Sequence, residues 1–125
     1  MYQKKIILNL KKKKKIKNNI LILGCTFKEN CPDIRNSQVK NLSILISKKV
    51  SKVDIFDPWV NEKILFSNKK IKQLENFPKN KYDSIIISVA HNIFQKIGAT
   101  RINNLVKKKS IVLDLKNLFK KNTFL

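Results

Sequence analysis

The chain has 125 residues, of which 42% are hydrophobic and 29% charged. This length suits one domain, and the composition is that of a globular protein rather than a disordered one. No apolar run approaches the roughly 20 residues of a membrane-spanning helix, and the N-terminus lacks the apolar core of a signal peptide.

The cysteines are Cys25 and Cys31, and the single histidine is His91. We therefore expect reduced thiols, a cytoplasmic location and no metal site, because the spacing does not suit zinc.

The net charge of +20 is typical of proteins that bind nucleic acids or anionic surfaces. Here the excess is almost all lysine, since Arg35 and Arg101 are the only arginines. Proteins that recognise nucleic-acid bases favour arginine for its bidentate contacts. Abundant Lys, Asn, Ile and Phe are also what an A+T-rich gene would encode. We therefore attribute the positive charge to the base composition of the gene and keep nucleic-acid binding as an alternative function.

The first predicted boundary lies near residue 18. Residues 1–17 are predicted to be a basic linker or the remnant of a helix, because Lys11–Lys15 is a run of like charges. Residues 18–125 are predicted to form the domain. It begins with a strand at Ile20–Leu23, whose continuous apolar run indicates burial on both faces, and continues with a polar loop at Cys25–Asn36.

The remaining elements follow in chain order. A helix is predicted from Asn36 or Ser37 to about Val50, because a polar residue that can cap it precedes an apolar helix face. Apolar, β-branched runs predict strands at Val53–Phe56, Ile71–Leu74, Ile85–Ile87 and Ile111–Leu113. Further helices are predicted at Glu62–Phe66, Asn92–Ile97 and Thr100–Val106.

Strands that alternate with helices predict an α/β fold, a Rossmann-like three-layer sandwich with a mostly parallel sheet. Ligands in such sheets bind beyond the C-terminal strand ends. Three segments follow strands in this way: Gly24–Asn36, Asp57–Trp59 and Asp114–Asn117. The chain has only two glycines, so neither GxGxxG nor a phosphate loop can be built. With one histidine and eight acidic residues, no catalytic residue is predicted.

Four strings carry a family resemblance. GCTFKENCPDIRNS, at residues 24–37, resembles the opening motif of the UDP-binding C-terminal domain of the UDP-glucose/GDP-mannose dehydrogenase family. VDIFDPWV, YDSIIISVAH and IVLDLK resemble later family motifs and occur in the expected order, so that the resemblance covers about residues 18–119. CPDIRNS and the Ala-His pair resemble the branch that oxidises C6 of UDP-N-acetylglucosamine or UDP-N-acetylgalactosamine to make polysaccharide precursors.

The resemblance implies roles for four residues. Phe27 and Lys28 would lie against the nucleotide sugar, where an ammonium group can balance a diphosphate. Lys116 would be a further basic substrate contact. Arg35 would reach an NAD cofactor that a different, N-terminal domain holds.

The residues by themselves leave other roles open. Phe27 could belong to the core and Lys28 could be one more solvated lysine. Arg35 could pair with a carboxylate at Asp33, Asp57 or Asp114. Trp59 is expected to anchor a turn by packing, and His91 to cap the following helix or bond a backbone group.

The resemblance also implies what the sequence lacks. The family's NAD-binding domain and its central domain, which carries the catalytic cysteine, have no counterpart here, so Cys25 and Cys31 are expected to be non-catalytic. The chain alone should bind a UDP-sugar weakly and oxidise nothing. It would be a fragment, an excised domain, or one subunit of a split enzyme with a partner chain. An inactive structural remnant of the same fold is the other alternative.

Overall fold

The computed structural model describes residues 19–35, 37–64, 66, 68–120 and 123–124. These residues contain five strands that form one sheet: β1 (Asn19–Leu23), β2 (Lys52–Phe56), β3 (Ile71–Leu74), β4 (Tyr82–Ile87) and β5 (Val106–Asp114). The strand order is β3-β2-β1-β4-β5, and every pairing between neighbours is parallel. The helices are α2 (Val39–Ser47), α3 (Asn92–Ile97) and α4 (Ala99–Asn103).

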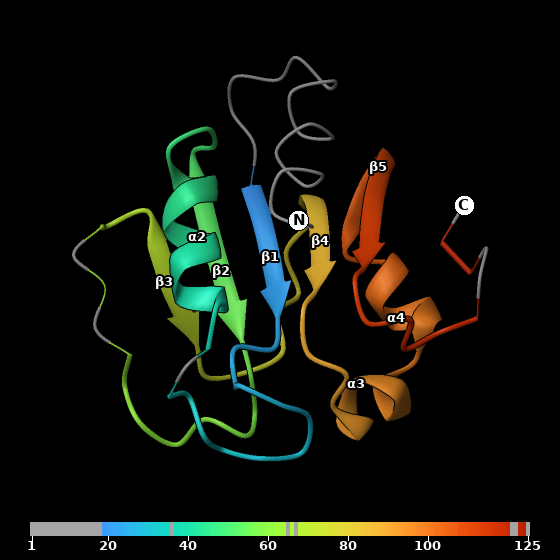
Figure 1. Cartoon of the computed structure of the whole chain (residues 1–125). Helices are drawn as coiled ribbons and strands as arrows, with labels where there is room; N and C mark the ends of the chain where they lie inside the picture. Colours follow the sequence, from blue (N-terminus) through green and yellow to red (C-terminus); the bar gives the residue numbers. More distant parts are fainter. Residues whose placement is uncertain (1–18, 36, 65, 67, 121–122, 125) are drawn as a thin grey trace.

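Both faces of the sheet are buried, which explains the continuous apolar runs in the central strands. Successive side chains of β1 point to opposite faces, so Ile20 and Ile22 join one core and Leu21 and Leu23 join the other. The first core is covered by α2, and the second contains Phe94 of α3 together with the buried residue of α4. Figure 1 shows α2 across β2 and the shorter helices beyond β4 and β5. The predicted three-layer α/β sandwich is confirmed.

The order of the strands creates a switch point at the centre of the sheet. From β1 the chain moves outward through β2 to the edge strand β3, then returns to place β4 on the other side of β1. The connections after β1 and β4 therefore lead away from each other, while the two strand ends lie side by side (Figure 1). In an open parallel sheet this divergence leaves a crevice for ligands.

Most of the predicted elements are confirmed, including the edge strand Ile71–Leu74. The helix predicted at Glu62–Phe66 is wrong, because the described residues of this segment are not helical. The Gln73 side chain explains the difference: its Oε1 accepts from the Ile64 N–H at 2.8 Å and its Nε2 donates to the Glu62 carbonyl at 3.1 Å. These backbone groups thus bond to the edge strand rather than within a helical turn.

Other boundaries also differ from the prediction. Val106 begins β5, where it pairs with Tyr82, and does not end a helix. The helix predicted from Asn36 or Ser37 to about Val50 spans Val39–Ser47, and its N-cap is Gln38. The predicted linker at residues 1–17 lies outside the described residues. In the part of the chain that is described, no helix is long and apolar enough to cross a membrane.

Candidate functional site

The buried carboxylate of Asp57 joins the C-terminal ends of β1 and β2. Its Oδ2 accepts from the backbone N–H groups of Cys25 at 2.7 Å and Thr26 at 3.2 Å. Its Oδ1 accepts from the Trp59 N–H at 2.9 Å, which closes the turn after β2. The side chain is only 1% exposed. Hydrogen bonds to an ionised, buried acceptor are strong, so this carboxylate fixes the start of the loop that follows β1.

His91 connects the end of β4 to the same carboxylate. Its Nδ1 accepts from the Asn30 backbone N–H at 2.8 Å, so the ring proton must be on Nε2 in this arrangement. Nε2 lies 2.9 Å from Asp57 Oδ2 and donates to it. The prediction that His91 bonds a backbone group is confirmed, whereas its side chain makes no capping hydrogen bond to α3. Asp57 and His91 therefore hold three strand ends together.

The loop after β1, residues 24–35, is closed by its own hydrogen bonds. The Thr26 hydroxyl donates to the Lys28 carbonyl at 2.8 Å, and the Phe27 N–H donates to the Asp33 carbonyl at 2.8 Å. Asn30 adopts a left-handed conformation, with φ 55, and its side-chain oxygen accepts from the first N–H of α3 at 2.9 Å. The loop backbone is thus held while Phe27 and Lys28 point outward. Phe27 is 58% exposed, so the alternative that placed it in the core is wrong.

The three predicted substrate residues line one cavity of about 240 Å³ at the switch point. Phe27 and Lys28 come from the loop after β1 and Lys116 from the turn after β5, and residues 88–90, after β4, complete the wall. Gln38 and Val39 at the start of α2 also line it.

The cavity suits an anion. It is lined by two lysines and one carboxylate, that of Glu29. The N-terminal end of α2 adds a partial positive charge, and no acidic residue in its first turn opposes this. A group with two negative charges, such as a diphosphate, therefore matches the cavity in sign.

Arg35 lies apart from this cavity. Its Nε and Nη2 donate to the Asp33 carboxylate at 3.0 and 3.1 Å, and its side chain is 85% exposed. This hydrogen-bonded pairing lowers the pKa of Asp33 below its ordinary value. Among the three carboxylate partners that the sequence left open, the structure selects Asp33. Arg35 lines a shallow surface cavity together with Cys31 and Asn61.

The described residues do not fit a resident dinucleotide. A dinucleotide diphosphate needs a glycine-rich turn between a strand and a helix. Gly24 is the only glycine in the connection between β1 and α2, and a Cβ added there would lie 2.6 Å from the Val89 Cβ. Gly24 thus serves the close packing of β1 against the end of β4 rather than contact with a phosphate.

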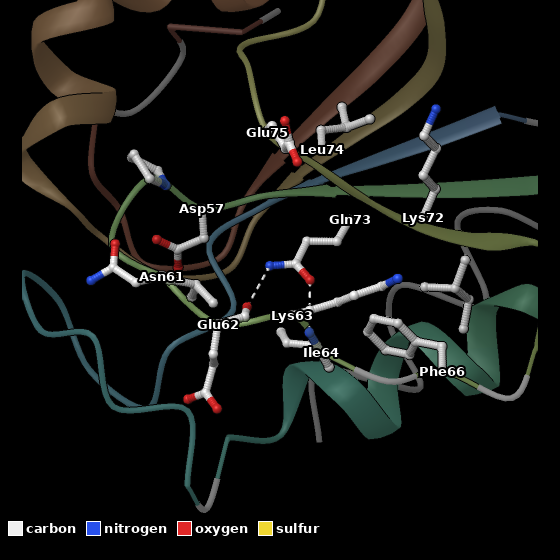
Figure 2. Close-up of a pocket in the computed structure, with 13 residues that line it drawn as sticks. Asp57, Asn61, Glu62, Lys63, Ile64, Phe66, Lys72, Gln73, Leu74 and Glu75 are labelled. Carbon is white, nitrogen blue, oxygen red and sulfur yellow. Dashed lines mark hydrogen bonds between the residues drawn. The ribbon is translucent and has the colours of Figure 1, made fainter.

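A larger cavity, of about 890 Å³, lies between the β2–β3 connection and the edge strand. Figure 2 shows Gln73 at its centre, with its two hydrogen bonds to the backbone of Glu62 and Ile64. Its charged side chains are mixed, since Glu62 and Glu75 oppose Lys63 and Lys72. This mixture makes it a poorer match to an anion than the smaller cavity at the switch point.

The cysteines have different surroundings. Cys25 is buried, and burial, together with the nearby Asp57 charge, raises its thiol pKa from 9.0 to about 12. Such a thiol stays protonated and is a poor nucleophile. Cys31 is half-buried. Among the residues that the structure describes, no group of three or more His, Cys, Asp or Glu side chains could hold a metal ion.

Sequence reasoning missed the link from Asp57 through His91 to Thr26. The Asp57–Trp59 segment was singled out for its place after a strand, but not for a buried carboxylate. The usable signals were an aspartate and a histidine shortly after two buried strands whose ends must lie close together.

These features define a class of domain: a Rossmann-like parallel sheet with an anion-compatible cavity at its switch point and no dinucleotide turn of its own. Residues 21–121 match the UDP binding domain of the UDP-glucose/GDP-mannose dehydrogenase family. The chain belongs to that family.

Related proteins agree with this assignment. The chain is 40% identical over 99 residues to UDP-N-acetyl-D-glucosamine 6-dehydrogenase from Salmonella typhi, and 38% identical over 99 residues to the enzyme of that name from Pseudomonas aeruginosa. These alignments cover 79% of this chain but only 23% and 24% of the relatives, so the chain spans about a quarter of their length. UDP-D-ManNAc dehydrogenase from Pyrococcus horikoshii shares the fold, with a TM-score of 0.71 at 23% identity over 96% of this chain and 27% of that one.

Proposed function

We propose that this chain binds a UDP-sugar, with the diphosphate in the cavity at the switch point. The observation that carries the proposal is the convergence of Lys28, Lys116 and the start of α2 on one cavity at the place where parallel sheets bind ligands. The exposed Phe27 ring lies at the same cavity, where it can pack on the uracil or the sugar.

The proposed sugar is an N-acetylhexosamine. The relatives with 40% and 38% identity are named for UDP-N-acetyl-D-glucosamine, whereas a UDP-glucose 6-dehydrogenase from Rickettsia bellii is 32% identical over 106 residues. The larger activity to which such a domain would contribute is the NAD-dependent oxidation of the sugar at C6. NAD would be held mainly outside these 125 residues, and Arg35 would be the contact that this chain provides.

The proposal is tested by calorimetric titration of the full chain with UDP and UDP-N-acetylglucosamine at about 0.15 M salt, where long-range surface charge is largely screened. Saturable binding is expected. Lys28→Ala should weaken it by about ten- to a hundredfold, since a charge-assisted hydrogen bond contributes about 1.5–3 kcal/mol. UDP-glucose should bind more weakly than UDP-N-acetylglucosamine if the sugar assignment holds.

The matched control is Lys63→Ala, which removes the same charge from the wall of the larger cavity. Equal losses for the two variants would mean that UDP affinity depends only on the overall charge of the chain.

Nucleic-acid binding is the second candidate function, favoured by the net charge of +20. It predicts salt-sensitive binding to duplex DNA of any sequence. DNA binding without UDP binding would contradict the proposal. Binding of neither ligand would favour the inactive remnant.

A further inference from the structure

We infer that Asp57, His91 and Thr26 are positioning residues that hold the Lys28 backbone at the edge of the cavity. This inference rests on the proposed function, since the lysine is placed for an anionic ligand. The binding role is thus assigned to buried residues. Thr26 lines the cavity with an uncharged side chain, and Asp57 and His91 are not among its lining residues.

The three side chains form a directional series of hydrogen bonds. His91 Nε2 lies 2.9 Å from Asp57 Oδ2 and 3.2 Å from the Thr26 hydroxyl oxygen, so its hydrogen can be shared between the two acceptors. The Thr26 hydroxyl then donates to the Lys28 carbonyl at 2.8 Å. Because the Thr26 hydroxyl donates its proton to Lys28, its oxygen can only accept from His91, so each group sets the orientation of the next.

The two ends of this series differ in burial. As whole residues, Asp57, His91 and Thr26 are 6%, 0% and 2% exposed, so their positions are fixed by close packing. Lys28 is exposed and lies in a loop. The buried side chains and the exposed Lys28 are thus linked by one hydroxyl group. That link lowers the conformational freedom that ligand binding must otherwise remove from the loop.

The first test compares Thr26→Val with Thr26→Ser. Valine keeps the branched shape but has no hydroxyl, and the bond from His91 to Asp57 remains. We expect UDP affinity of the full chain to fall about three- to tenfold, the loss typical of one hydrogen bond. Serine restores the hydroxyl and should keep the affinity within about twofold of the unchanged chain.

The second test is a double-mutant cycle with Lys28→Ala. If Thr26 acts through Lys28, the double variant should bind UDP no more weakly than Lys28→Ala alone. Multiplied losses would overturn the inference, as would unchanged affinity in Thr26→Val. Thermal unfolding measured on each variant confirms that the compared proteins are folded. If the unchanged chain fails to bind UDP, the proposed function and this inference are overturned together. If the unchanged chain binds UDP and Thr26→Val binds it equally well, only this inference is overturned.

Two histidine variants keep the inference testable if Thr26→Val does not fold. In His91→Gln the side-chain amide can donate from near the position of Nε2, whereas in His91→Asn the shorter side chain can only replace Nδ1. The glutamine variant should therefore bind UDP more tightly than the asparagine variant. The reverse order would show that the bond to Asn30, rather than the series ending at Lys28, supports binding.

Discussion

Replacing Asp57 by Asn tests the buried carboxylate most sharply. The carboxylate accepts from Cys25, Thr26, Trp59 and His91. In the asparagine variant, the side-chain oxygen can accept from the three donors at Oδ2 only if the NH₂ group takes the place of Oδ1. The NH₂ group then faces the Trp59 N–H, and both of these groups are donors. Three bonds lose their charge assistance, at about 1 kcal/mol each, and the fourth is lost at about 1 kcal/mol. The expected destabilisation is about 4 kcal/mol, a large part of the 5–15 kcal/mol typical of a domain.

Urea unfolding followed by far-ultraviolet circular dichroism measures this loss. With a slope of about 2 kcal/mol per molar urea, the midpoint should fall by about 2 M. The control is Asp33→Asn, whose carboxylate bonds Arg35 at the surface, where water can replace the contact. Its midpoint should change much less. If both variants shift the midpoint equally, the buried carboxylate does not organise the strand ends.

Two further predictions concern chemistry and packing near the same strand ends. At pH 8 a thiol-specific reagent should label Cys31 and leave Cys25 unmodified in the folded chain. The reason is that a pKa of about 12 leaves only about one Cys25 thiol in ten thousand ionised. Equal labelling rates for the two cysteines would contradict the burial of Cys25. Gly24→Ala should lower the free energy of unfolding by at least about 2 kcal/mol, since φ is +97 and the new Cβ would meet Val89 at 2.6 Å. Gly98→Ala, with φ +93 but open space around it, should cost less, and equal losses would exclude the clash as the cause.

The fold could be predicted largely because its strands are buried on both faces. Runs such as Ile20–Leu23 and Ile85–Ile87 have few alternatives to a central parallel strand. The segment at Glu62–Phe66 could not be predicted in the same way. Its backbone bonds to the side chain of Gln73, nine residues beyond Ile64, and a local helical pattern carries no information about such a partner.

The candidate site was only partly predictable. The resemblance pointed to Phe27, Lys28 and Lys116, and the structure places them around one cavity. Its buried support could not be found from local patterns, because His91 bonds Asn30 from 61 residues away and Asp57 from 34 residues away. Such contacts follow from strand order, which the sequence alone does not determine.

UDP binding at the switch point is tested directly by a ¹H–¹⁵N NMR titration of the full chain with UDP at about 0.15 M salt. We expect saturable shifts in the amides of residues 26–29, 38–39, 88–90 and 116, which line the cavity at the switch point. Shifts confined to the larger cavity at residues 60–64 and 71–75, or scattered over the lysine-rich surface without saturation, would contradict it.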